Sequence, residues 1–293
     1  MRRISKVLGL LRIRLLQDFL SFRVLLVFAL MALYVAAALK PMREFGDWAG
    51  CGVAPGIFVF LVDEHICQLV LCGAALVMFS RAPFRSDMDN YLLPRAGRLS
   101  LAMGNCLYIL IVSVLYIGAL FLTQTACLNT SLNLGDGWGK LIRSLGQGIV
   151  PDGFNSEFFV NNSIVRIYDA NRALMNVLSL ETLCIAFLGM VIYVGNRAFA
   201  KPVGLWIGGG FVMLDLTIYN MLPEAWNAFS PLALPRLSSY AYRYYMPLGG
   251  SVAYGYLFLV SGIIALIAIA LLEEKHLSAG GRQLFTRKGV KRK

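Results

Sequence analysis

The sequence LSLAMGNCLYILIVSVLYIGALFLT, Leu99–Thr123, decides the fold class. It runs for 25 residues without a charged side chain. A helix that crosses a bilayer needs ~20 mostly apolar residues. This stretch therefore predicts a membrane-spanning helix, and the rest of the chain repeats the pattern.

Five further stretches are long or apolar enough to be spans, which predicts an all-α polytopic membrane protein with six transmembrane helices. Hydrophobic residues make up 58% of the 293 residues and charged residues only 15%. A soluble domain has about 45–50% apolar and ~25% charged residues. This composition excludes a soluble enzyme, a disordered chain and a nucleic-acid-binding domain. The other expected spans are Val24–Leu39, Gly56–Ser80, Ala173–Gly195, Val203–Leu222 and Val252–Leu272.

The distribution of basic residues predicts that both termini are cytoplasmic. With that orientation, the inner segments 1–23, 81–98, 196–202 and 273–293 hold 19 of the 27 Lys and Arg. Without the two tails, the inner loops still hold 6 basic residues in 25 positions, against 8 in 94 for the outer loops 40–55, 124–172 and 223–251. Cytoplasmic loops carry such an excess. Most of the net charge of +11 then lies on the cytoplasmic side, where it fixes the orientation and favours contact with anionic lipid.

We expect one transmembrane domain over 1–293: an interfacial helix at 1–23, a six-helix bundle at 24–272 and a basic cytoplasmic tail at 273–293. In the first segment, apolar residues recur at helical spacing opposite Arg2 and Lys6, although Leu10 interrupts the polar face. Such a helix lies along the cytoplasmic leaflet. The alternative is a long, basic start to the first span. The apolar face is Ile4, Val7, Leu8, Leu11, Leu15, Phe19 and Phe22.

No motif in the chain indicates catalysis, a cofactor or a metal. The chain has two His and lacks HExxH, paired CxxC and G-x-S-x-G motifs. Gly135–Lys140, GDGWGK, lacks the spacing of a phosphate-binding loop, so we interpret it as a turn. Most of the six Cys lie in apolar runs, and only Cys51 and Cys127 are candidates for an external disulfide, which the sequence leaves open.

The inner loop RAPFRSDMDNYLLPRAGR, 81–98, predicts a short helix that docks on a protein partner. Ser86 is a suitable N-cap, Asp87 and Asp89 suit the positive end of a helix, and Pro94 ends it. Its apolar tip would face the cytosol, which favours protein contact. The alternative is a plain loop whose Arg residues only fix orientation. The candidate residues are Ser86, Asp87, Met88, Asp89, Asn90, Tyr91, Leu92 and Leu93.

The arrangement resembles the permease subunit of a type-2, exporter-class bacterial ABC transporter. The resemblance rests on the N-terminal helix, the six spans and the segments DNYLLPRAGR (89–98) and FSPLALPRL (229–237). It implies that the 86–93 helix couples to a separate ATP-binding subunit, that two permease subunits pair, and that 223–251 forms short re-entrant helices at an outer gate. The outer loop 124–172 is longer than is usual in this class. The chain itself would then not be an enzyme.

Polar side chains inside the expected spans are the other candidates, because such residues are costly in a membrane. They are Asp63, Glu64, His65, Glu181 and Asp215. Counted along the spans, Asp63, Glu181 and Asp215 lie at a similar depth in the outer third of the membrane. At least one of these carboxyl groups would stay protonated there, and Arg236 or Arg243 could neutralise another. We expect either a shared gate or substrate path, or separate hydrogen-bonded structural residues.

Two other classes of function fit the same sequence. One is an ion-coupled secondary carrier or intramembrane enzyme that uses the buried acids and His65. The other is a non-transporting membrane immunity or assembly protein. The sequence does not identify the substrate, the direction of transport or the choice between homodimer and heterodimer.

Overall fold

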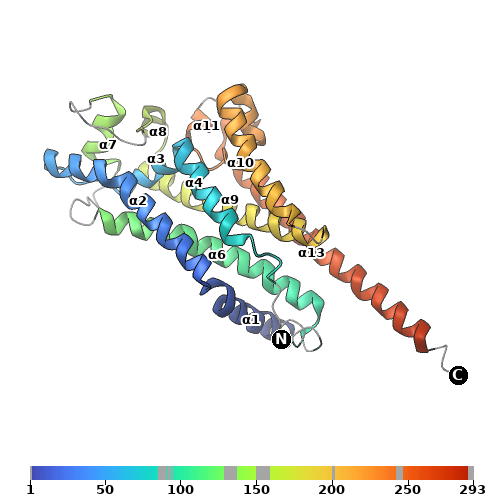
Figure 1. The fold of residues 1–293 in the computed structure, drawn as a ribbon. Coiled ribbons are helices and arrows are strands. Elements are labelled where there is room, and N and C mark those ends of the chain that lie inside the picture. Colours follow the sequence, from blue (N-terminus) through green and yellow to red (C-terminus); the bar gives the residue numbers. More distant parts are fainter. Residues whose placement is uncertain are drawn as a thin grey trace.

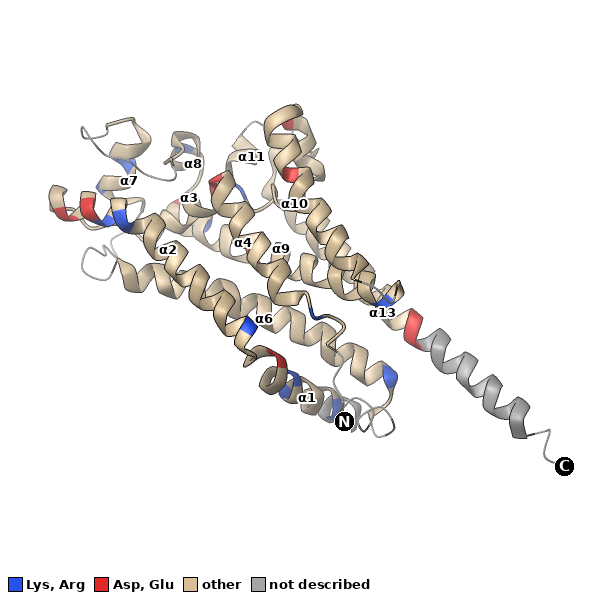
Figure 2. Cartoon of the chain, in the orientation of Figure 1, with Lys and Arg blue, Asp and Glu red and all other residues tan. Residues whose placement is uncertain are grey.

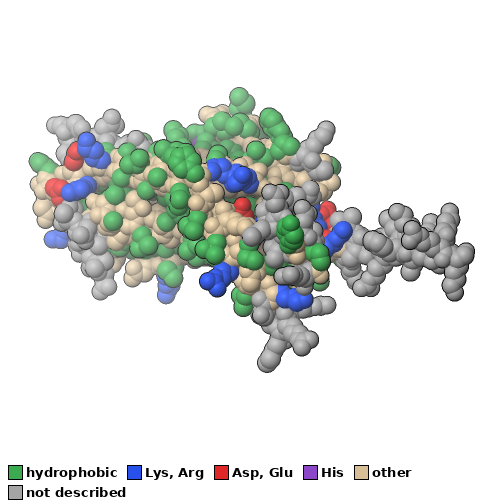
Figure 3. Space-filling model, turned by 60° about the horizontal axis from the view of Figure 1, so that its bottom comes forward, with side chains coloured by type: hydrophobic (Ala, Val, Ile, Leu, Met, Phe, Trp, Pro, Cys, Tyr) green, Lys and Arg blue, Asp and Glu red, His purple; other side chains and the backbone are tan. Residues whose placement is uncertain are grey.

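A computed structural model describes residues 2–84, 91, 94, 96–128, 137–149, 159–199, 202–241 and 247–289 (Figure 1). Throughout these residues the regular structure is helical and contains no β-strand. The expected all-α class is therefore confirmed. Apolar side chains are spread over the flank of the bundle (Figure 3), as expected for a surface that faces lipid.

Within the residues described above, five helices are long and apolar enough to cross a membrane, so the chain is a multi-pass membrane protein. The first of them continues ten residues beyond the apolar stretch that ends at Leu39, and this extension carries exposed ion pairs between Lys40 and Glu44 and between Arg43 and Asp47. The five spans are α2 (Phe22–Ala49), α6 (Arg98–Cys127), α9 (Ala170–Ala198), α10 (Val203–Met221) and the Val252–Glu274 part of α13 (Val252–Gly289).

The expected span Gly56–Ser80 is not one continuous helix. It consists of α3 (Ile57–Asp63) and α4 (His65–Phe79), and the helix axis bends by 81° between them. The break lies at Glu64, whose backbone is extended with φ −70° and ψ 127°. The count of six spans holds only if this bent pair is one of them.

Helix α9 is the centre of the bundle, with 78% of its most apolar window buried. It packs against α4, α6, α10 and α13. Glycine makes the contact with α10 possible, because a Cβ on Gly204 would lie 2.4 Å from the carbonyl oxygen of Ile192. The neighbouring Gly208 would meet Leu76 of α4 at 2.8 Å.

The N-terminal segment forms a separate helix, α1 (Arg2–Arg14), followed by a π-helical turn at Leu15–Phe19. Its buried face differs from the predicted one: Leu10 and Leu11 are buried against the bundle, whereas Leu8 is 53% exposed. The reason is that α1 packs on α6 at Gly104, where an added Cβ would lie 3.2 Å from the Cβ of Leu10. The neighbouring helix thus selects which face is buried.

The two ends of the bundle differ in their connections (Figure 1). We call one the loop end: it holds α3, α7 (Gly139–Gly146), α8 (Asn162–Ile167), the 3₁₀ helix η2 (Glu224–Phe229), α11 (Ser238–Ala241) and α12 (Pro247–Gly250). The other, the tail end, holds α1, the turn after α4 and the C-terminal part of α13. Charged residues concentrate toward these ends (Figure 2).

Candidate functional site

The segment 230–238 at the loop end is buried although it belongs to no spanning helix. Ser230, Leu232, Leu234 and Leu237 are completely shielded from solvent. Successive turns shape the segment; in one of them the Arg236 amide donates to the Ala233 carbonyl at 3.2 Å. A backbone buried in this way needs polar partners. Side chains of α3, α4 and α10 make polar contacts with it, so we call this segment the anchored segment.

Asp215 on α10 binds the anchored segment through a buried charge cluster. Its Oδ1 accepts hydrogen bonds from Arg236 Nη2 at 2.8 Å and from Ser230 Oγ at 2.7 Å. His65 lies beside both charges, with Nδ1 3.4 Å from Asp215 Oδ2 and in contact with Arg236 Nη1. Asp215 is fully buried. A charge pair this deep persists only when its hydrogen bonds are made, so this cluster fixes the anchored segment to α10.

Of the other two acids, Asp63 binds the same segment directly, whereas Glu181 is linked to it through Gln68. Asp63, at the end of α3, accepts from the Ser238 amide at 2.9 Å and so caps the short helix α11. Glu181 on α9 accepts from Gln68 Nε2 at 2.7 Å. The same Gln68 nitrogen reaches the Leu232 carbonyl at 3.3 Å. Three helices thus hold the anchored segment from different sides.

The three acids therefore converge on one segment without forming a carboxylate cluster. Within the described residues, no hydrogen bond or ion pair joins Asp63, Glu181 and Asp215 to one another. The structure places Arg236 on Asp215, as the sequence analysis considered. Arg243 lies outside the described residues.

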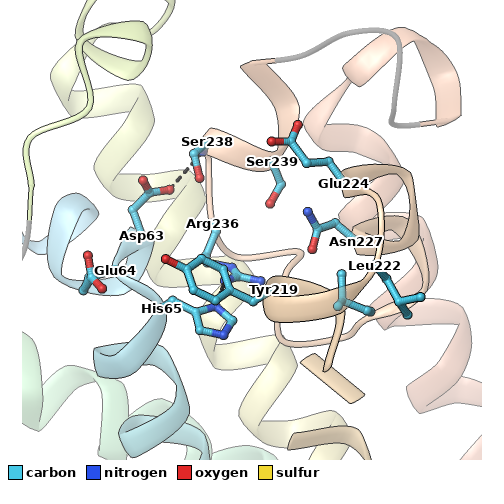
Figure 4. Close-up of a pocket in the computed structure, with 11 residues that line it drawn as sticks. Asp63, Glu64, His65, Tyr219, Leu222, Glu224, Asn227, Arg236, Ser238 and Ser239 are labelled. Atoms are coloured by element: carbon cyan, nitrogen blue, oxygen red, sulfur yellow. Dashed lines mark hydrogen bonds between the residues drawn. The ribbon is translucent and has the colours of Figure 1, made fainter. Parts of the chain in front are cut away.

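Glu64 and His65 line a cavity that the bend between α3 and α4 creates (Figure 4). The cavity has a volume of about 290 Å³. Residues at the end of α10, in η2 and in the anchored segment also line it. Among the described residues, no group of three or more His, Cys, Asp or Glu side chains is arranged to hold a metal ion. The site is therefore a polar pocket with one bound guanidinium in its wall.

The proposed docking residues lie outside the described residues, apart from Tyr91, which is 77% exposed. The turn that leads to them, Ser80–Phe84, is described and is held from several helices. Arg23 of α2 donates to Ser80 Oγ at 2.7 Å. Asn196 of α9 donates to the Ala82 carbonyl at 2.8 Å, and Asn105 of α6 to the Pro83 carbonyl at 3.4 Å. We call these contacts the tail-end clamp.

Comparisons with protein-family models, with curated proteins and with solved structures found no match. What the chain does must therefore be inferred from its own geometry.

The sequence analysis missed the polar residues that hold the turn and the anchored segment. Gln68, Asn105 and Asn196 are uncharged, and each is buried in a largely apolar helix. An amide in a membrane span needs a partner, which is the same signal that singled out the acids. Asn196 also accepts from the Gly204 amide at 2.8 Å, so it joins the tail-end clamp to the start of α10.

Cys51 and Cys127 are not joined by a disulfide. Cys51 and Cys127 are both free thiols, and each is partly exposed. Tryptophan packing holds this region instead: Trp138 lies 5.2 Å from Phe60 between ring centroids and donates to the Tyr168 carbonyl at 2.9 Å. The long connection between α6 and α9 is thereby attached to α3.

Proposed function

We propose that the chain is the membrane-spanning permease subunit of an ABC transporter, with the tail end in the cytoplasm. A separate ATP-binding subunit would supply the energy, and a second permease subunit would complete the pathway. The Lys and Arg asymmetry supports this orientation. The direction we favour is export, because the resemblance is to the exporter class.

The observation that carries the proposal is the tail-end clamp. The turn Ser80–Phe84 leads directly into the candidate coupling residues 86–93. Side chains from α2, α6 and α9 bind that turn, so a displacement of the coupling residues pulls on three spans at once. Asn196 extends the connection to α10 through the Gly204 amide. A loop that only enforced orientation would not need these bonds.

The anchored segment supports the same proposal at the opposite end. Hydrogen bonds join this segment to α3, α4 and α10, so its position depends on the arrangement of these three helices. A switch between two arrangements of packed helices would move or release it. We therefore assign the outer gate to the anchored segment.

The test is co-purification with an ATP-binding subunit, sought first among the products of the neighbouring genes. Replacing Tyr91 and Leu92 with Asp should abolish co-purification and transport, because charges would disrupt an apolar contact. The matched control replaces Ile149 and Phe159 with Asp; both are exposed, at 63% and 84%, and lie at the loop end. Normal partner binding by the first variant, with both proteins inserted at wild-type levels, would rule out docking at 86–93.

A second candidate, an ion-coupled carrier, is favoured by Glu181. This carboxyl is fully buried, and within the described residues its Oε1 lacks a hydrogen-bond partner. Proton-driven uptake into proteoliposomes that contain this chain alone would support the carrier. Transport that requires ATP and a partner subunit would support the permease.

A further inference from the structure

The cavity between α3, α4 and α10 has the size and shape of a small-molecule site (Figure 4). Its volume is about 290 Å³. Small-molecule pockets usually measure ~300–1,000 Å³, so this one suits a ligand of few atoms. Glu224 of η2 and Tyr219 of α10 line it and are exposed, which places the mouth at the loop end.

The charge of the lining is negative. Asp63, Glu64 and Glu224 contribute three carboxyl groups. Within the described residues, none of the three forms a salt bridge. Arg236 also lines the cavity, but its guanidinium is already paired with Asp215 at 2.8 Å. Such a lining concentrates cations.

An aromatic ring forms one wall. Tyr219 stacks on His65, with ring centroids 3.9 Å apart and an angle of 15° between the planes. His65 thus covers one face of the phenol, while 65% of Tyr219 remains exposed. A cation within ~6 Å of the open face would be attracted by the ring.

Two nitrogen atoms of the wall side chains are buried and lack a hydrogen-bond partner among the described residues. Arg236 Nε and His65 Nε2 have no hydrogen-bond partner among the described residues, and the two side chains belong to residues 6% and 4% exposed. A guanidinium only donates, so its contact with His65 Nδ1 fits the tautomer that carries the imidazole proton on Nε2. Leaving such donors unpaired costs about 1–3 kcal/mol, so a ligand oxygen that approached them would add affinity.

We propose that this cavity binds a small organic monocation that also carries a hydrogen-bond acceptor oxygen. The carboxylates and the open face of Tyr219 hold the ammonium group, and the wall formed by Arg236 and His65 faces the acceptor. That this ligand is the transported substrate rests on the proposed function. Binding itself does not.

Acetylcholine is the probe, because it combines a quaternary ammonium with an ester oxygen. Two analogues separate the contributions: 3,3-dimethylbutyl acetate replaces the charged nitrogen with carbon, and pentyltrimethylammonium removes the ester. Titration calorimetry of the full chain in detergent should show acetylcholine binding at least about tenfold more tightly than the neutral ester. Pentyltrimethylammonium should bind with intermediate affinity.

Variants locate the site. Glu224→Gln and Tyr219→Leu should each weaken acetylcholine binding about two- to fivefold, as expected for an exposed charge contact and a cation–π contact. Glu44→Gln and Trp226→Leu are the matched controls, because Glu44 lies on the distant α2 and Trp226 does not line the cavity. Both controls should bind as the wild type does.

Three results would overturn the proposal: no binding of acetylcholine up to about 10 mM, equal affinity for the neutral ester, or unchanged affinity in both cavity variants. Because the titration uses this chain alone, it does not depend on an ATP-binding subunit. A failed co-purification with intact cation binding would refute only the permease, and the reverse result would refute only the cation site.

Discussion

Arg236 of the anchored segment donates from Nη2 to Oδ1 of Asp215 on α10, across 2.8 Å and in a fully buried setting. The two residues are 21 positions apart and belong to different parts of the loop end. The pair therefore determines where the anchored segment sits relative to α10.

Breaking this pair should destabilise the protein by more than the pair itself contributes. Asp215→Asn or Arg236→Gln alone leaves one buried charge unpaired, which costs about 3–5 kcal/mol. The double variant removes both charges and should recover much of that loss. Thermal unfolding in detergent measures the three variants. Losses that simply add in the double variant would show that the two side chains are not coupled.

The three acids should act together on transport if the anchored segment is a gate. Single replacements Asp63→Asn, Glu181→Gln and Asp215→Asn each remove or weaken a contact that leads to that segment. We expect transport per folded molecule to change and pairs of replacements to be non-additive. Transport assays normalised to folded protein provide the measurement. Independent losses of stability with unchanged transport would indicate purely structural acids.

Close packing of α9 and α10 should make Gly204 intolerant of any side chain. A Cβ there would lie 2.4 Å from the Ile192 carbonyl oxygen, so the helices must separate in Gly204→Ala. Overpacking of this kind costs about 1–3 kcal/mol. Gly209 is on the same helix with nothing within 4 Å of a Cβ, so Gly209→Ala is the control. Equal unfolding temperatures for the two variants would contradict the packing.

The expected orientation can be tested with single cysteines in a background without the six native ones. Phe159→Cys, at an 84% exposed position of the loop end, should react with an impermeant thiol reagent added to intact cells. Tyr91→Cys and Gly281→Cys should react only after lysis. Labelling at position 281 in intact cells would place the C-terminus outside.

Most of the span positions could be predicted because apolar length is a local property of the sequence. Hydropathy alone missed the ends of α2, where the helix continues beyond the apolar core and carries the Lys40–Glu44 and Arg43–Asp47 pairs. It also missed the break at Glu64. At that bend Asp63 and His65 contact the anchored segment, whose residues Ser238 and Arg236 lie 175 and 171 positions later in the chain.

The residues of the candidate site were predictable, but of their partners only Arg236 was. Asp63, Glu181 and Asp215 stand out as charges in apolar stretches. The partners of Glu181 and of Asp63, which are Gln68 and the Ser238 amide, carry no such mark. Contacts of this range are a product of tertiary packing, and a single sequence does not encode them locally.

The burial of α9 has a consequence for how the protein depends on its surroundings. The most apolar window of this helix is 78% buried, against 22% for those of α10 and α13. Substitutions on α9 should behave as in the interior of a soluble protein, with the same effect in any detergent or lipid. The outer faces of α10 and α13 meet acyl chains directly, so the thickness and composition of the bilayer should set the energetic effect of substitutions there.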